Sequence, residues 1–164
     1  MVKIITRYDQ LNMRQYLDVM EDSIHADAEI IWFHRPIESA ILCEEQSVRS
    51  YLLNHFFGKE DCVCLVWEED GVYVSALRME PFRDGLILTA LETKPDCRRR
   101  GYAQKLVQSA MEYAAGRKVY AHISKKNKAS LALHKKAGFQ KILDHAVYLD
   151  GDISTSSITM CYGE

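Results

Sequence analysis

The chain has 164 residues, of which 48% are apolar, and a formal net charge of −2 at pH 7. This length suits one domain with a sizeable core, so we expect residues 1–164 to form a single domain. No apolar stretch approaches the roughly 20 residues of a membrane helix, and five cysteines without CxxC spacing indicate neither a disulfide framework nor a zinc site, so we expect a cytoplasmic protein that uses no metal.

The N-terminal part predicts a strand followed by two amphipathic helices. Residues 1–6 are typical of a strand, and apolar side chains then recur at helical spacing in residues 13–24 and in residues 48–56. Between the helices, residues 30–36 are aromatic and irregular. This stretch fits a core-packing connector as well as a substrate contact.

Two Asp-Gly pairs organise the next three predicted strands, which are residues 62–67, 72–79 and 86–91. Asp70-Gly71 joins the first strand to the second, and Asp84-Gly85 joins the second to the third. Asp-Gly between two β-rich runs is a strong hairpin signal. The three strands are therefore expected to form an antiparallel meander.

A basic turn containing a glycine follows this meander and leads into a predicted helix that stops near Gly116. The turn spans residues 98–101, with three arginines before Gly101. Unpaired N–H groups and the positive end of the helix dipole make such a helix start a site for a pyrophosphate. Gly101 and Ala103 leave room for the phosphates. Cys97, beside the arginines, is either a packing residue or a thiol whose pKa is lowered.

The C-terminal part predicts a strand, a helix and a closing hairpin. A helical crossover separates residues 119–123 from the preceding strand, so these two strands are expected to be parallel. A helix is expected over residues 129–137. The closing hairpin pairs residues 139–148 with residues 153–162 around Asp150-Gly151. Alternating strands and helices of this kind indicate an α/β fold.

Charge is distributed unevenly along the chain. Residues 1–93 carry 8 basic and 17 acidic residues, whereas residues 94–141 carry 13 basic and 2 acidic ones. This asymmetry suggests a polyanionic ligand on one side of the protein and a cationic partner on the other.

Two motifs, together with the order of the elements, carry a family resemblance. The first places Pro95 after a strand and before Arg98-x-x-Gly101-x-Ala103, and the second reads Asn127-x-x-Ser130-x-x-Leu133-His134-x-Lys136-x-Gly138-Phe139. Both resemble the GNAT acetyltransferase superfamily, over essentially the whole chain. The resemblance implies a mixed central sheet with an antiparallel N-terminal meander, a splayed pair of parallel strands and a C-terminal hairpin, flanked by helices. His134 stands where the family usually has tyrosine.

The resemblance also implies acetyl-CoA as cosubstrate. The main chain of residues 91–93 would pair with the pantetheine arm, and the Thr93 N–H would stabilise the oxyanion at the thioester. The basic segment and its helix start fit the phosphates of this ligand. The residues expected to bind it are Leu91, Glu92, Thr93, Arg98, Arg99, Arg100, Gly101, Tyr102, Ala103, Gln104, Asn127, Ser130 and Lys136.

Acyl transfer to an amine needs a group that removes a proton, because a primary amine with a pKa of about 10.4 is protonated at neutral pH. Glu92 and His122 are the candidate bases, with a water relay as the alternative. The structural alternatives are an exposed strand carboxylate for Glu92 and a satisfied core histidine for His122. The family's tyrosine would protonate the departing thiolate. We expect His134 to be a weak replacement, because Lys135 and Lys136 would lower its pKa and leave it neutral.

These observations predict an acyl-CoA-dependent N-acyltransferase. A non-catalytic acyl-CoA sensor stays open because the tyrosine is missing, and a nucleic-acid-binding module is disfavoured because the lysines gather at the cofactor motifs. The acidic N-terminal half favours a small cationic amine as acceptor over a protein N-terminus or lysine. We expect no nucleic acid and no membrane as partner, and a homodimer is left open.

Overall fold

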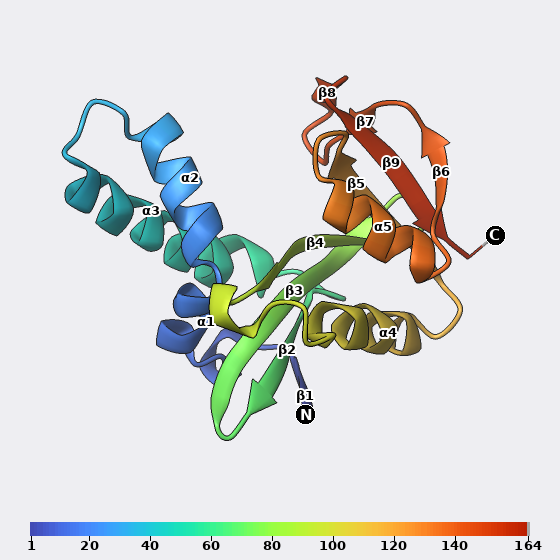
Figure 1. The fold of residues 1–164 in the computed structure, drawn as a ribbon, viewed down its shortest axis with the longest axis horizontal. Coiled ribbons are helices and arrows are strands. Elements are labelled where there is room, and N and C mark those ends of the chain that lie inside the picture. Colours follow the sequence, from blue (N-terminus) through green and yellow to red (C-terminus); the bar gives the residue numbers. More distant parts are fainter. Residues whose placement is uncertain (164) are drawn as a thin grey trace.

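The computed structural model describes residues 1–163, which form a seven-stranded sheet, a small two-stranded sheet and flanking helices (Figure 1). The strands are β1 (Val2–Ile5), β2 (Val63–Glu69), β3 (Val72–Phe82), β4 (Gly85–Thr93), β5 (Lys118–Ser124), β6 (Gln140–Leu143), β7 (Ala146–Val147), β8 (Ile153–Ser154) and β9 (Ser157–Tyr162). The α-helices are α1 (Met13–Val19), α2 (Glu21–Ile31), α3 (Ile37–Tyr51), α4 (Tyr102–Ala114) and α5 (Lys128–Lys136). Shorter helical segments are η1 (Tyr8–Gln10), η2 (Leu52–Phe56) and η3 (Pro95–Cys97).

The large sheet has the order β1-β2-β3-β4-β5-β9-β6 and is antiparallel except between β4 and β5. The predicted meander and the predicted parallel pair are therefore confirmed. At the β2–β3 turn, Asp70 and Gly71 have φ angles of +49° and +80°, as an Asp-Gly hairpin requires. At the next hairpin Gly85 already belongs to β4, and its role is different. A Cβ there would lie 2.2 Å from the carbonyl oxygen of Lys118, so glycine allows β5 to approach.

The parallel strands β4 and β5 separate halfway along β4, as the family resemblance implies. Their pairing runs from Gly85 opposite Lys118 to Leu88 opposite Ala121 and stops there. Two residues later, Ala90 has a φ of +49°, and the β3–β4 register shifts at this bulge. The remainder of β4 therefore runs free of β5.

Buried side chains form a core on each face of the sheet. Alternation along β3 shows this directly, because Ala76 belongs to the core with α1 and Leu77 to the core with α4. In Figure 1, α2 and α3 pack side by side and project from the first of these faces, whereas α4 packs against β2 to β5 on the other face. Within residues 1–163, no helix combines the length and apolar character that a membrane crossing requires.

The N-terminal helices differ from the prediction. The apolar pattern of residues 13–24 continues across two helices, because the backbone breaks at Met20, which ends α1 and begins α2. The second predicted helix begins earlier, at Ile37, and its last turn is the π-helix η2. The connector between them does not pack into the core, since Ile30 and Phe33 are 73% and 79% exposed.

The closing hairpin is present with an interruption. Strands β6 and β9 pair as predicted, but the residues between them form the separate β7–β8 pair. Strand β9 also pairs with β5, which places it between β5 and β6.

Candidate active site

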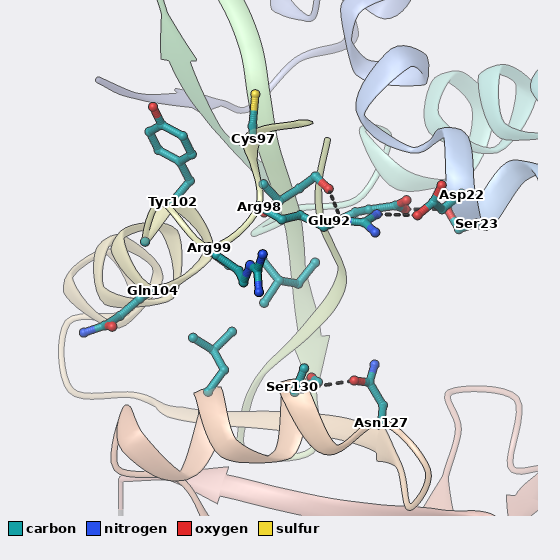
Figure 2. Close-up of a pocket in the computed structure, with 16 residues that line it drawn as sticks. Asp22, Ser23, Glu92, Cys97, Arg98, Arg99, Tyr102, Gln104, Asn127 and Ser130 are labelled. Carbon is teal, nitrogen blue, oxygen red and sulfur yellow. Dashed lines mark hydrogen bonds and ion pairs between the residues drawn. The ribbon is translucent and has the colours of Figure 1, made fainter. Parts of the chain in front are cut away.

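A cavity of about 880 Å³ opens where β4 leaves β5, between the start of α4, helix α5 and the first turn of α2 (Figure 2). It is called the groove below. Its lining consists of Asp22, Ser23, Leu91, Glu92, Thr93, Cys97, Arg98, Arg99, Gly101, Tyr102, Ala103, Gln104, Asn127, Ala129, Ser130 and Leu133. All but two of the residues predicted to bind the cofactor are in this set. Arg100 lies outside the lining, and Lys136 instead donates from Nζ to Oε1 of Gln104 at 3.1 Å, which links α5 to α4.

The start of α4 has the form of an anion site. Gly101 precedes the helix with a φ of +83°, and a Cβ at this position would meet nothing within 4 Å. None of the described side chains caps the helix, so the N–H groups of its first turn point at the groove without a side-chain acceptor. Arg99, with a φ of +60°, points into the groove in Figure 2. This arrangement suits a phosphate or pyrophosphate.

The free part of β4 exposes main-chain groups to the groove. The N–H of Lys94 donates to the carbonyl oxygen of Val74 on β3 at 3.0 Å. Successive N–H groups of a strand point to opposite edges, so the N–H of Thr93 faces away from β3, toward the opened side. The Ser75 hydroxyl holds this end of β4 in place by donating to the Glu92 carbonyl oxygen at 2.8 Å.

Arg98 connects β4 to α2. Its Nε donates to the carbonyl oxygen of Thr93 at 2.9 Å, and its guanidinium forms an ion pair with Asp22 (Figure 2). Arg98, which the sequence suggested as a phosphate ligand, lines the groove, and in the structure Asp22 is its ion-pair partner. Asp22 and its neighbour Ser23 were missed at the sequence level, because nothing in the pattern of an amphipathic helix marks its first turn as part of a site.

Glu92 is a partly buried carboxylate at the end of the groove next to α2. Its Oε2 accepts a hydrogen bond from the Ser23 hydroxyl at 2.7 Å (Figure 2). Its Oε1 is buried and has no partner among residues 1–163. Burial raises the pKa of this carboxyl, and the hydrogen bond from Ser23 partly opposes that effect. A carboxylate in this state is a suitable proton acceptor.

His122 lies in a smaller cavity of about 210 Å³ that also contains His134 and shares Leu91, Asn127 and Ser130 with the groove. The His122 ring makes edge contacts with Phe82 and Tyr148, at centroid distances of 5.3 and 5.2 Å. Its Nε2 is buried and has no hydrogen-bond partner among the described residues. Burial, and then Arg83, lower its pKa and favour the neutral ring.

His134 is 2% exposed and holds one tautomer. Its Nδ1 lies 2.9 Å from the carbonyl oxygen of Ser130, which can only accept, so Nδ1 carries the proton. Its Nε2 is therefore bare in the neutral ring, and it is buried without a partner in the described part of the chain. The pKa of His134 is lowered, as predicted, but burial is the cause rather than the neighbouring lysines.

Cys97 lines the groove, and of the two interpretations left open for it, the thiol with a lowered pKa is contradicted. Burial raises its pKa, and Asp96 raises it further by hydrogen bonding and charge. The adjacent Arg100 opposes this effect without reversing it. Cys97 is therefore a thiol at neutral pH.

Solved structures with the same fold include acetyltransferases of several kinds. PaiA N-acetyltransferase from Thermoplasma acidophilum, in complex with coenzyme A, has a TM-score of 0.69 at 16% identity and covers 100% of this chain and 99% of that one. A ribosomal-protein-alanine N-acetyltransferase from Brucella melitensis has a TM-score of 0.64 at 20% identity, covering 100% and 99%. An aminoglycoside 6'-acetyltransferase type Ii has a TM-score of 0.64 at 13% identity, covering 99% and 96%. These likenesses establish the fold, and no curated protein sequence matches the chain significantly.

The sequence profile described as the acetyltransferase (GNAT) family matches residues 11–139. The match contains α1 to α5, the meander, both predicted motifs and the whole groove lining. This chain belongs to the GNAT acetyltransferase family.

Proposed function

We propose that this protein transfers the acetyl group of acetyl-CoA to the nitrogen of a small primary amine, and that Glu92 accepts the proton of that amine. One observation carries the proposal. A single groove joins an uncapped helix start, where phosphates fit, to a buried carboxylate with one free oxygen.

The residues of the groove fit coenzyme A at both ends. The first turn of α4 offers N–H groups and open space above Gly101 for the pyrophosphate, and Arg99 adds a cation. The edge of β4 at Leu91 and Thr93 offers main-chain groups for a ligand that binds by strand-like pairing. When bound, acetyl-CoA supplies an acetyl group activated as a thioester.

Glu92 would perform the proton transfer on which the reaction depends. Its Oε1 takes a proton from the ammonium group, which leaves the nitrogen with a lone pair for bonding to the acetyl carbon. The C–N bond forms first and gives a tetrahedral intermediate, and the C–S bond then breaks, with the sulfur leaving with the electron pair. The thiolate takes the second proton that the nitrogen loses, which gives the amide and the free thiol. The Thr93 N–H would stabilise the negative charge that develops on the acetyl oxygen.

The proposal does not specify which amine accepts the acetyl group. The solved structures of similar fold are named for acceptors as different as a ribosomal protein and an aminoglycoside. A thiol-release assay with acetyl-CoA and longer acyl-CoAs against a varied panel of amines tests the function. Amine-dependent thiol release is the expected result, whereas tight binding of acetyl-CoA without release with any amine would instead indicate a sensor.

Arg99 is expected to contribute to coenzyme A binding through its charge. Arg99→Ala should raise the Kd about tenfold at low ionic strength, because a hydrogen bond to a charged group is worth about 1.5–3 kcal/mol, and by less at high salt. Calorimetric titration at two salt concentrations measures this. Arg100→Ala is the matched control, because Arg100 lies outside the groove lining and its removal should change the Kd little. Equal losses in both variants would show that only the overall charge of the segment matters.

His134 is expected to matter little as an acid. Its bare Nε2 cannot donate a proton, and a thiol with a pKa of about 8.5 leaves readily without help. His134→Ala should therefore lower turnover by about tenfold or less, below the usual range of general acid catalysis. His134→Tyr should preserve or raise turnover. A drop of 10² or more in His134→Ala, with unchanged coenzyme A affinity, would contradict this and make His134 a proton donor.

A further inference from the structure

Arg78 on β3 is a partly buried cation without an ion-pair partner among residues 1–163. Its Nε is fully buried and makes no hydrogen bond, and the guanidinium forms no ion pair with any of residues 1–163. The group lies over the rings of Tyr51 and Phe56, at 5.2 and 5.7 Å from their centroids. Buried charges in proteins are normally paired, so this arginine calls for an explanation.

The nearest carboxylate along the strand is already engaged. Glu80 lies two residues after Arg78, and therefore on the same face, and is only 4% exposed. Its carboxylate accepts from Lys59 Nζ at 3.3 Å and from the Tyr51 hydroxyl at 3.4 Å. Lys59 thus neutralises Glu80, and Glu80 does not serve as the counterion of Arg78.

Arg78 and Glu92 lie on the same face of the sheet, the one covered by α1 to α3. Glu92 stands opposite Ala76, and Arg78 is two residues from Ala76 on the same strand. Arg78 itself pairs with Thr89, and the β-bulge at Ala90 lies between the two pairs. Both charges affect the pKa of Tyr16 on α1. Burial raises the pKa of the Tyr16 phenol, Arg78 partly opposes this, and Glu92 adds to it.

These two groups are complementary but do not meet. Glu92 Oε1 is a buried acceptor without a donor, and Arg78 Nε is a buried donor without an acceptor. No ion pair joins the two side chains. A ligand with an ammonium group and a carboxylate a few bonds apart would satisfy both, whereas a simple aliphatic amine would leave Arg78 unpaired.

We propose that the acceptor is a small amino acid, whose amine faces Glu92 and whose carboxylate binds Arg78. This inference rests on the proposed acetyltransferase function and names its substrate class. It also replaces the expectation of a purely cationic amine, which was drawn from the acidic N-terminal half. The overall charge of a segment does not reveal a single inward-facing arginine.

The test compares L-amino acids with their primary amides in the thiol-release assay. The two members of each pair share the amine and differ in the negative charge. Wild-type protein should acetylate at least one amino acid with a KM about tenfold or more below that of its amide. Arg78→Met, which removes the charge at similar volume, should raise the KM for that amino acid by about 10–100-fold and leave the amide unchanged. Arg78→Lys keeps the charge without the guanidinium fork. Its KM for the amino acid should therefore lie between the values of the wild-type protein and of Arg78→Met.

A binding measurement supplements the kinetics. In the presence of coenzyme A, the N-acetylated amino acid should raise the melting temperature of wild-type protein and not that of Arg78→Met. Equal use of amino acids and amides by wild-type protein would overturn the inference while leaving the acetyltransferase function intact. Acetylation of no amine at all, with acetyl-CoA still bound, would overturn the proposed function and the inference with it. If Arg78→Met does not fold, the inference is tested by the comparison of amino acids with amides in wild-type protein and by the KM values of Arg78→Lys.

Discussion

Replacing Gly101 by glutamate is expected to abolish the stabilisation of this protein by acetyl-CoA. A ligand that binds only the folded state at a hundredfold excess over its Kd stabilises that state by about 2.7 kcal/mol, or roughly 5–10 °C for a chain of this size. The glutamate would place bulk and negative charge in the open space before α4, where the pyrophosphate must approach the helix N–H groups. Differential scanning fluorimetry with and without acetyl-CoA measures the loss.

Gly116 supplies a matched control at the other end of the same helix. It has a φ of +87° and, like Gly101, open space around its missing Cβ, but it is not part of the groove lining. Gly116→Glu therefore carries the same backbone strain and the same added charge, and it should keep the full ligand-induced shift. Gly101→Ala, which adds strain and little bulk, should lose part of the shift. A normal shift in Gly101→Glu would mean that the phosphates bind elsewhere.

Glu92→Gln is expected to lower turnover by roughly 10²–10⁴ at neutral pH, the usual range for loss of a general base, without weakening coenzyme A binding. Glutamine keeps the shape and can keep the contact with Ser23, but it cannot accept the proton. The deficit should shrink as the pH rises, because more of the amine is then already neutral. Steady-state kinetics across pH, with coenzyme A affinity measured in parallel, provide the test.

The raised pKa of Glu92 predicts the direction in which wild-type turnover changes with pH. Burial raises the pKa of Glu92, so the carboxylate becomes protonated, and useless as a base, at a pH above the ordinary carboxyl value. Wild-type turnover should therefore fall on the acid side through this raised pKa, and Glu92→Gln should lack that step. His122→Ala should retain most of its activity, because His122 lines only the smaller cavity. The opposite pattern would make His122 the base, and full activity in both variants would point to a water relay from another residue.

Local signals in the sequence predicted much of the fold. Asp-Gly between β-rich runs predicted the meander, and a helical crossover predicted the parallel strands. The break at Met20 could not be predicted in this way, because the apolar spacing continues across it and only the backbone bends. The bulge at Ala90 was also unmarked, since an alanine with positive φ has no sequence signature.

The groove was predictable where it follows one continuous motif, and not where it depends on contacts between distant segments. Residues from Arg98 to Gln104 form the turn and helix start that the motif indicated, and most of them line the groove. The ion pair between Arg98 and Asp22 joins positions 76 residues apart, and no local pattern in the sequence indicates it. The placement of Arg78 near Glu92 depends on the register between β3 and β4, which periodicity alone does not give.

The position of β9 in the sheet has a consequence for how the protein is made. Strand β9 lies between β5 and β6, although it is the last of these three strands in the sequence. During synthesis, the edge of β5 therefore stays unpaired until β9 has emerged, and an unpaired strand edge can join other chains. Because β5 also lines the smaller cavity beside the groove, this cavity is completed late. Until β9 has emerged, the newly made chain is thus open to misassembly at a strand that lines this cavity.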